Sequence, residues 1–509
     1  MPDQSTSCDV IIRNGQIIDG TGAEPVRADL AVRDGRIVEV GVIRRGQCGR
    51  EIDATGLVVS PGFIDIHTHA EANLLKYPDA WNYLSQGVTT AIGGNCGGGP
   101  IPLEDYASRA EPADMGINLG LLAGHNAIRG KAMGSENRAP TSAELNRMVD
   151  LLREAMEDGA YGFSSGLRYV PGAYAKTDEV IALARVASAH GVIYVTHMRD
   201  EGLGLIESVQ ESILIGREAG LPLQISHFKA VGKKMWGRAG EILDLVDSAR
   251  SAGQDVTFDQ YPYTASSTGL TVLFPSWALA GGRATRLEKW KTPDVRNKIR
   301  DGIIFNLMED RGGGDPANVV LVTSPYDAAF GGMHLGEVTD KLFGNTTIEN
   351  VAETVIRLSE AGHHPCVFHC MDENDVQRIM QHPAGLIASD SHIVPPDETH
   401  PHPRNFGTFP RVLGHYVRDP KLLPLPEAIR KMTGAVAQRL GLIDRGLIKN
   451  GHRADLTVFD PNTIADRATW TQPKQTAVGI HHVFVNGQVA MENGQQTGKM
   501  AGMFLKRTD

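Results

Sequence analysis

Cysteine is scarce in this chain of 509 residues, which contains five: Cys8, Cys48, Cys96, Cys366 and Cys370. Their number is odd and their spacing is irregular, so the pattern lacks the disulfide framework of small secreted domains. We therefore expect each cysteine to be a free thiol or a metal ligand.

Long apolar runs and excess positive charge are also missing. No stretch approaches the roughly 18 uninterrupted apolar residues of a membrane span, and the first residues lack the positive start and apolar core of a signal peptide. The formal net charge is -10 and the pI is near 6.0, which gives no electrostatic footprint for nucleic acid or an anionic membrane. These absences favour a cytoplasmic protein that acts on a small molecule.

Short strand patterns dominate the two ends of the chain. Near the start, apolar runs alternate with turn signals, and Asn-Gly and Asp-Gly pairs at 14–15 and 34–35 are typical of hairpin turns. The same pattern returns near the end, with an Asn-Gly pair at 486–487. We expect segments 1–60 and 441–509 to pair into one small β-sandwich.

Between these ends, over residues 61–440, short apolar runs alternate with amphipathic stretches, which indicates a parallel α/β domain. One helix is expected to begin at Thr141, because Glu144 has capping-box spacing from it, and to end near Gly159. A second is expected over 177–191, where a glycine ends the pattern.

Eight strand-like runs occur in this middle region: 63–67, 88–94, 117–125, 161–166, 192–197, 221–227, 256–263 and 385–390. Eight such runs separated by helical stretches predict a (β/α)8 barrel of the TIM type. Two further candidate strands lie between the seventh and eighth runs. We therefore expect an insertion, and a candidate lid, at about 275–375.

Six potential ligands or acid/base groups fall at or just past the ends of these runs: His67, His69, Cys96, His197, His227 and Asp390. In a barrel the carboxyl ends of the strands point to one face, and catalytic groups there come from different strands. The six side chains are therefore expected to converge.

The types of these residues favour metal chemistry. His67 and His69 are two residues apart, so on a strand both imidazoles project from the same face. Cys96 with His197 and His227 would make a catalytic zinc set that leaves one coordination position open.

Asp390 closes the last run, where a carboxylate can take a proton from water and later give it to a leaving amine. Read in isolation, it is equally compatible with a helix cap or a turn. Its position beside the expected metal ligands favours the acid/base role.

Together the motifs resemble those of the amidohydrolase superfamily and, within it, the D-aminoacylase (N-acyl-D-amino-acid deacylase) branch. The motifs that carry this resemblance extend over nearly the whole chain: PGFIDIHTH, SQGVTT, GNCG, SGLRYVPG, THMRDEG, ISHFKAVG, DQYPYTASST, ASDSH and HPRNFGTF. The resemblance implies that Cys96, His197 and His227 hold a tightly bound zinc. It also implies a second, weaker metal position at His67 and His69.

The resemblance further implies the reaction and the substrate contacts. Asp390 matches the general acid/base, and Lys229, Tyr261 and Ser267 match residues that hold the substrate α-carboxylate. Tyr169 is expected to line the same pocket, and the HPR segment at 402–404 is expected to be a structural loop near its mouth. The implied reaction is hydrolysis of an N-acyl-D-amino acid to a free D-amino acid and a carboxylate.

The sequence gives little information about which substrates the protein prefers. The preference for D over L substrates follows from the resemblance alone. The apolar segment at 268–282 favours neutral or hydrophobic side chains, and nothing in the sequence predicts the oligomeric state.

Two alternatives compete with this interpretation. Cyclic-amide hydrolases of the hydantoinase or dihydropyrimidinase kind share the barrel and the HxH pair, but they use a bridging carboxylated lysine, and the run at 161–166 has no lysine. A non-catalytic scaffold of the same fold is the other alternative. Such proteins typically lose metal ligands, whereas this chain keeps all six candidate groups.

Overall fold

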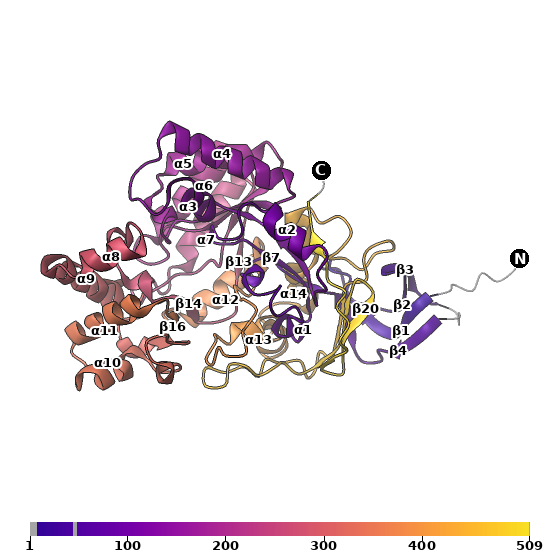
Figure 1. Cartoon of the computed structure of the whole chain (residues 1–509). Helices are drawn as coiled ribbons and strands as arrows, with labels where there is room; N and C mark the ends of the chain where they lie inside the picture. The colour runs from indigo at the N-terminus through magenta and orange to yellow at the C-terminus, as the bar shows by residue number, and fades with distance from the viewer. Residues whose placement is uncertain (1–7, 44–47, 508–509) are drawn as a thin grey trace, which may run out of the picture.

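The computed structural model describes residues 8–43 and 48–507. The strands nearest the N-terminus lie at one end of the molecule, and a group of helices, α8 to α11, lies at the other (Figure 1). Parallel strands with their connecting helices occupy the space between them. This central part carries the candidate site.

The two ends of the chain share one nine-stranded sheet. Its strands are β1 (Cys8–Ile17), β2 (Val26–Arg33), β3 (Arg36–Gly41), β4 (Cys48–Asp53), β5 (Val58–Pro61), β18 (Leu456–Phe459), β19 (Ile480–Val485), β20 (Gln488–Glu492) and β21 (Gln495–Gln496). Strand β5 joins the two halves, because it pairs in parallel with β1 and antiparallel with β18.

The sequence predicts three hairpin turns, at 14–15, 34–35 and 486–487, and the first of these predictions is wrong. Asp34 and Asn486 have positive φ and lie at the β2–β3 and β19–β20 turns. Asn14, with φ 59°, instead lies inside β1, where the pairing with β2 shifts register. The following Gly15 is required there, because a Cβ would lie 2.6 Å from a methyl of Val59. A local Asn-Gly signal cannot distinguish a bulge from a turn.

The expectation that every cysteine is a free thiol or a ligand is wrong for two of the five. Strands β1 and β4 pair in parallel with Cys8 opposite Cys48, and these two residues form a disulfide. The pairing depends on a non-local strand contact that cysteine spacing does not reveal. Cys96, Cys366 and Cys370 are free.

Parallel strands form two further sheets, and each of the eight expected runs contains at least one of their strands. The first sheet contains β6 (Phe63–Asp65), β7 (Val88–Gly93), β8 (Asn118–Leu121) and the C-terminal β22 (Phe504–Leu505). The second contains β9 (Ala123–Gly124), β10 (Gly162–Gly166), β11 (Ile193–His197), β12 (Leu223–Ile225), β13 (Val256–Gln260) and β17 (Gly385–Ile387).

The two parallel sheets meet at both edges. On one side only Leu122 separates β8 from β9. On the other, the Asp390 amide donates to the His67 carbonyl at 2.9 Å, and the His69 amide donates to the Ser391 carbonyl at 2.7 Å. The series of parallel strands therefore returns from β17 to β6, and the carboxyl ends of these strands face the same side.

Helices follow the parallel strands and contact one another in sequence: α3 with α4, α4 with α5, α5 with α6, α6 with α7, and α7 with α12. Their bounds are α3 (His125–Met133), α4 (Ser142–Glu157), α5 (Thr177–Ser188), α6 (Leu205–Ala219), α7 (Ala239–Ser251) and α12 (Glu373–Gln381). The remaining helices near these sheets are α1 (Trp81–Leu84), α2 (Glu104–Ala110), α13 (Arg404–Arg411), α14 (Leu425–Met432) and α15 (Gly434–Leu440).

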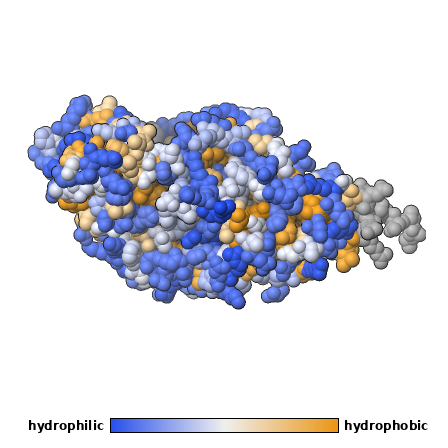
Figure 2. All heavy atoms as spheres, turned by 90° about the horizontal axis from the view of Figure 1, so that it is seen from below, coloured by the Kyte–Doolittle hydropathy of each residue, from blue (hydrophilic) through white to orange (hydrophobic). Residues whose placement is uncertain are grey.

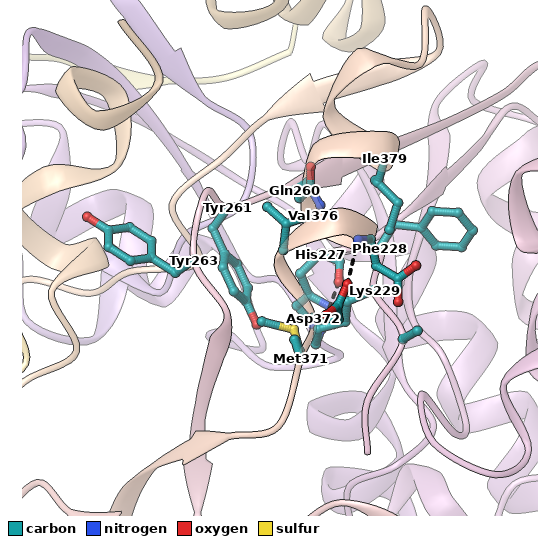
Figure 3. A pocket seen from close by; sticks show the side chains of 12 residues that line it. His227, Phe228, Lys229, Gln260, Tyr261, Tyr263, Met371, Asp372, Val376 and Ile379 are labelled. Carbon is teal, nitrogen blue, oxygen red and sulfur yellow. Dashed lines mark hydrogen bonds between the residues drawn. The ribbon is translucent and has the colours of Figure 1, made fainter. Parts of the chain in front are cut away.

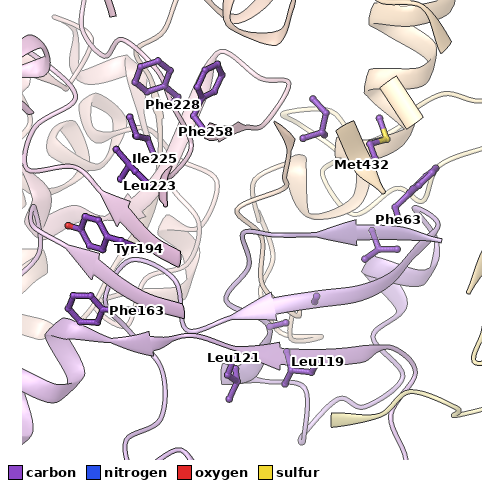
Figure 4. Packing of buried hydrophobic residues seen from close by; sticks show 14 of the residues in the cluster. Phe63, Leu119, Leu121, Phe163, Tyr194, Leu223, Ile225, Phe228, Phe258 and Met432 are labelled. Atoms are coloured by element: carbon purple, nitrogen blue, oxygen red, sulfur yellow. The ribbon is translucent and has the colours of Figure 1, made fainter. Parts of the chain in front are cut away.

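The main hydrophobic core lies between the strands and these helices. Phe163, Tyr194, Leu223 and Phe258 come from four successive strands and belong to one buried cluster (Figure 4). Helix residues such as Leu183 complete it. Because the apolar residues of the strands pack outward in this way, polar residues at the strand ends are left to face the site.

The chain between β13 and α12 forms a separate group of elements. It holds a three-stranded antiparallel sheet of β14 (Ala265–Gly269), β15 (Val319–Leu321) and β16 (Pro365–His369), with helices α8 (Arg283–Trp290), α9 (Pro293–Phe305), α10 (Leu335–Phe343) and α11 (Ile348–Ala361). These elements share a second core, which includes Phe274 and Val355 and reaches Tyr261 at the end of β13.

The helices and the surface can be compared with what a membrane-spanning protein needs, within the part of the chain that the structure describes. None of the helices there combines the length and the apolar character that a membrane crossing needs. The face drawn in Figure 2 is mostly hydrophilic, with apolar residues in small areas.

Helix α4 gives a first testable prediction. The Thr141 hydroxyl accepts from the Glu144 amide at 3.3 Å, and the Thr141 amide donates to the Glu144 carboxylate at 2.7 Å, which completes the expected capping box. Thr141→Ala removes the side-chain acceptor and should lower the free energy of unfolding by about 1 kcal/mol in urea denaturation. Thr141→Ser keeps the acceptor and should match the wild type; an alanine variant of unchanged stability would contradict the prediction.

Candidate active site

The structure brings the six predicted groups together at the carboxyl ends of the parallel strands. Three overlapping sets have ligand atoms within 4.8 Å of one another. The sets are His67 with His69 and Cys96, Cys96 with His197 and His227, and His67 with His227 and Asp390. His67 and Cys96 each belong to two sets, so the six side chains form one continuous cluster.

Backbone geometry shapes this cluster. Cys96, His227 and Asp390 have φ of 53°, 35° and 51°, the left-handed region that residues with a side chain rarely adopt. Such positions cost about 1 to 3 kcal/mol each and persist where the surrounding structure dictates them. Around Cys96 the glycines are required, because a Cβ at Gly94 would lie 2.2 Å from the Leu122 carbonyl oxygen.

The Cys96 sulfur lies at the centre of the histidines. Its Sγ is 3.4 Å from His67 Nε2, 3.7 Å from His197 Nδ1 and 3.6 Å from His227 Nε2. Burial raises the pKa of the Cys96 thiol, but the charge on His67 and the hydrogen bonds from His197 and His227 hold that pKa well below its usual range. A thiolate with two imidazole nitrogens is a donor set that fits zinc and leaves a position open for water or substrate.

Carboxylates hold the far nitrogens of these rings. His67 Nδ1 is 3.2 Å from Asp259, His227 Nδ1 is 3.0 Å from Glu201, and His197 Nε2 is 3.6 Å from Glu201. Metal-binding histidines usually donate their second N–H to such a partner, which fixes the orientation of the ring. The arrangement therefore points His227 Nε2 and His197 Nδ1 toward the sulfur.

Asp390 follows β17 and faces the same centre. Its Oδ1 lies 3.4 Å from His69 Nε2 and 3.6 Å from His67 Nε2, and its Oδ2 lies 2.8 Å from Arg404 Nη1. Burial raises the pKa of Asp390, but the Arg404 guanidinium and the His69 hydrogen bond hold it well below its usual range. The carboxylate is therefore ionised at neutral pH and can accept a proton.

Two cations lie near the ring of Tyr261. The Lys229 ammonium is 5.6 Å and the Arg404 guanidinium 4.7 Å from the centre of its ring. Figure 3 shows Lys229 and Tyr261 lining one pocket beside His227. Among the described residues the buried Tyr261 hydroxyl has no hydrogen-bond partner. A buried donor close to two cations is suited to an anionic ligand.

Tyr169 and Ser267 lie less directly in the cluster. The Tyr169 ring packs 4.6 Å from the His197 ring, and its hydroxyl is 3.0 Å from the Thr268 hydroxyl. Ser267 precedes Thr268 on β14 and is half-buried. Within the described residues the Ser267 hydroxyl makes no hydrogen bond, so its contact with a carboxylate stays a prediction.

Three residues of the site were not identified from the sequence. Glu201 and Asp259 hold the histidine rings, and Arg404 contacts Asp390 instead of serving only in a loop at the mouth. The 402–404 segment does have a structural part, since His402 Nδ1 accepts from the Arg404 amide at 2.9 Å. The sequence did carry a signal for two of them, because Glu201 in THMRDEG and Asp259 in DQYPY are carboxylates within four residues of a predicted site residue at a strand end.

Comparison with known proteins gives likenesses over almost the full length. A model of the amidohydrolase family matches residues 50–272 and 344–491. A D-aminoacylase from Alcaligenes xylosoxydans xylosoxydans is 40% identical over 98% of this chain and 98% of its own length.

Solved structures agree. A D-aminoacylase studied for its binuclear metal centre, with one-metal activation and second-metal attenuation, has a TM-score of 0.84 and 36% identity over 98% of this chain and 100% of its own. The zinc-bound N-acyl-D-glutamate deacylase of Bordetella bronchiseptica, in complex with a phosphonate that mimics the tetrahedral intermediate, has a TM-score of 0.82 and 34% identity over the same shares. A D-hydantoinase has a TM-score of 0.52 at 16% identity, a likeness of fold alone.

The lowered pKa of Cys96 predicts selective alkylation. A thiol whose pKa lies well below its usual range is a thiolate at neutral pH, and the thiolate is the reactive form. In zinc-stripped protein at pH 7, iodoacetamide should therefore label Cys96 first, as measured by peptide mass spectrometry, and added zinc should slow the labelling. Burial raises the pKa of Cys370 to about 11 and also raises that of Cys366, so these two serve as internal controls. Faster labelling of either control would refute the assignment.

Proposed function

The chain belongs to the amidohydrolase family, and we propose that it uses zinc to hydrolyse the amide bond of N-acyl-D-amino acids, releasing a D-amino acid and a carboxylate. The observation that carries this proposal is the Cys96, His197 and His227 donor set facing the ionised Asp390. Full-length likeness to a D-aminoacylase and to an N-acyl-D-glutamate deacylase supports the substrate class.

We infer that the two parallel sheets are one (β/α)8 barrel, supported by the hydrogen bonds that join residues 67–69 to 390–391. The proposed division is a terminal β unit from 1–60 and 441–509 around the 61–440 barrel. An insertion at about 275–375 is supported by helices α8 to α11 and by the gap in the family match after residue 272.

The proposed metal ligands fall into two groups. Cys96, His197 and His227 would hold one zinc tightly, and His67 and His69 would contribute to a second, weaker position. When bound, zinc polarises the scissile carbonyl and lowers the pKa of water. A structurally similar D-aminoacylase is described as activated by one metal and attenuated by the second, which supports activity with a single zinc.

Asp390 is the proposed general base and acid. Its carboxylate takes the proton of the attacking water and then gives it to the departing amine, so the proton leaves with the D-amino acid. Arg404, 2.8 Å away, keeps the carboxylate ionised until that transfer. His69 and His67 hold the opposite oxygen, which fixes the direction in which the proton is delivered.

The proposed α-carboxylate site lies beside Asp390. Lys229 and Tyr261 would bind the carboxylate, because one is a cation and the other is a buried hydroxyl that lacks a partner. Burial raises the pKa of Tyr261 well above its usual range, so its hydroxyl stays protonated and can donate. Ser267 is proposed as a third contact, and Tyr169 as a wall of the pocket.

The apolar segment 268–282 favours neutral or hydrophobic substrate side chains. One cation does lie beside it, since Arg168 Nη2 donates to the Val272 carbonyl at 2.9 Å. Relatives that act on N-acyl-D-glutamate and N-acyl-D-aspartate are 36% and 35% identical to this chain. A substrate series must therefore include acidic side chains.

The two alternatives have less support. Strand β10, with the sequence GFSSG, offers no lysine to carry a bridging carboxylate, and a D-hydantoinase structure resembles this one only in fold. A non-catalytic scaffold would have no need to keep Cys96, Asp390 and the four histidines within reach of one another.

The decisive experiment compares paired N-acetyl-D- and N-acetyl-L-amino acids of leucine, methionine, phenylalanine and glutamate, with zinc measured on the same sample. Only the D series should release amino acid. Asp390→Asn should lower kcat by about 10²- to 10⁴-fold while zinc content is retained, because only the proton transfer is lost. Cys96→Ala should lose zinc together with activity. Zinc-loaded protein that turned over neither series would exclude the deacylase function and favour cyclic amides.

Arg404 gives a prediction about pH. Because its guanidinium lowers the pKa of Asp390, Arg404→Met should raise that pKa by about 1 to 3 units. Activity requires the ionised carboxylate, so the acid limb of the kcat/KM profile should move to higher pH by the same amount. Arg147→Met, which changes an exposed arginine on α4, is the matched control and should leave the profile unchanged. An unshifted acid limb in Arg404→Met would refute the role of Arg404.

A further inference from the structure

Glu201 is a buried carboxylate that the proposed reaction leaves without a role. It lies four residues after His197, in the loop that follows β11, and it is 3% exposed. Its backbone carbonyl accepts from the Val231 amide at 2.8 Å, which fixes the loop against the segment that carries His227 and Lys229. The side chain is therefore held in place from a second strand end.

Three functional groups share this one carboxylate. Oε1 accepts from Lys229 Nζ at 2.5 Å and lies 3.0 Å from His227 Nδ1, while Oε2 lies 3.6 Å from His197 Nε2. An ionised carboxylate has room for about four hydrogen bonds and donates none, so it can receive all three. A glutamine side chain, which has the same shape, could accept only through its oxygen, because its nitrogen is a donor.

The hydrogen-bonding roles follow from the chemistry of each partner. A neutral imidazole that binds zinc through one nitrogen carries its proton on the other. His227 Nδ1 and His197 Nε2 are the nitrogens that face away from Cys96. His227 Nδ1, at 3.0 Å, would donate to Glu201, whereas His197 Nε2, at 3.6 Å, is in electrostatic contact with it and makes no hydrogen bond. Lys229 can only donate, and its Nζ lies 2.7 Å from His227 Nδ1, which accepts from it when that nitrogen carries no proton. When zinc binding places the proton on Nδ1, the two groups are both donors, so they compete for Glu201.

We propose that Glu201 is a positioning residue that couples the two zinc-binding histidines to Lys229, the cation for the substrate carboxylate. The inference rests on the proposed function, which supplies both the zinc and the carboxylate. A change at Glu201 should therefore alter zinc affinity and binding of the substrate α-carboxylate together, because its one negative charge interacts with both the histidines and Lys229.

The first test replaces the charge with a neutral side chain of the same shape, in the full-length protein. In Glu201→Gln, zinc affinity measured by competition with a chromophoric chelator should fall about 10- to 100-fold. In zinc-saturated protein, KM for N-acetyl-D-leucine should rise about tenfold, as expected for one lost charge contact of about 1.4 kcal/mol. KM for the N-acetylated amine that lacks the carboxylate should stay the same.

Glu179→Gln is the matched control. Glu179 is also a buried carboxylate, 5% exposed, and it binds Arg129 and His125 of helix α3, which are not among the candidate metal ligands. Both readouts should match the wild type in this variant. Glu201→Gln with unchanged zinc affinity, or with zinc affinity reduced and KM unchanged, would overturn the coupling.

A second variant keeps the test decisive if Glu201→Gln does not fold. Lys229→Gln removes the competing ammonium, so the histidines gain a larger share of Glu201 and zinc should bind about two- to tenfold more tightly. Zinc affinity that is unchanged or lowered in Lys229→Gln would overturn the proposal without any need for the Glu201 variant. Where Glu201→Gln does fold, the double variant should lose the gain, because the shared carboxylate is gone.

The zinc measurements need no turnover, which separates this inference from the proposed function. Wild-type protein that hydrolyses the D series while both variants bind zinc normally would overturn the coupling and leave the deacylase function standing. Wild-type protein that hydrolyses neither series would contradict the deacylase function, and the chelator competition would still decide whether Glu201 links the histidines to Lys229.

Discussion

Backbone hydrogen bonds between residues 67–69 and 390–391 join the last parallel strand to the first, and the arrangement of the site depends on them. They place the two histidines of the HxH pair against Asp390. The buried Asp65 reinforces this junction, because its carboxylate accepts from the Ser389 amide at 3.0 Å and from the Ser389 hydroxyl. Burial raises the pKa of Asp65 to about 7, and the Ser389 donors just after β17, with the His67 amide, oppose that rise.

Charge balance explains why so many polar groups can be buried together. An unpaired buried charge is costly, but three carboxylates of the site each face a cation or an imidazole: Asp390 faces Arg404, Glu201 faces Lys229, and Asp259 faces His67. The same pairs set the chemistry. Arg404 keeps Asp390 ionised for proton transfer, while Asp259 and Glu201 turn imidazole nitrogens toward the Cys96 sulfur.

Much of this arrangement could be predicted from local patterns, because strands and their polar ends are encoded in consecutive residues. The eight strand runs and the capping box at Thr141 are of this kind. Features that depend on distant pairing could not be predicted. The Cys8–Cys48 disulfide needs the register of β1 with β4, and the contact of Arg404 with Asp390 needs the path of a loop. The hairpin turn predicted at Asn14 was wrong for a different reason, because a bulge and a turn share one local conformation.

Three residues of the site have a strained backbone conformation. Cys96, His227 and Asp390 all occupy the left-handed region, and each lies just past a strand, where the chain turns away from the sheet. Turning the backbone there aims the side chain inward across the strand ends. The strain is offset by the packed strands and helices below, which carry the main core. The segment that holds β14 to β16 and helices α8 to α11 has a core of its own, so changes in that segment need not relax the geometry of these three residues.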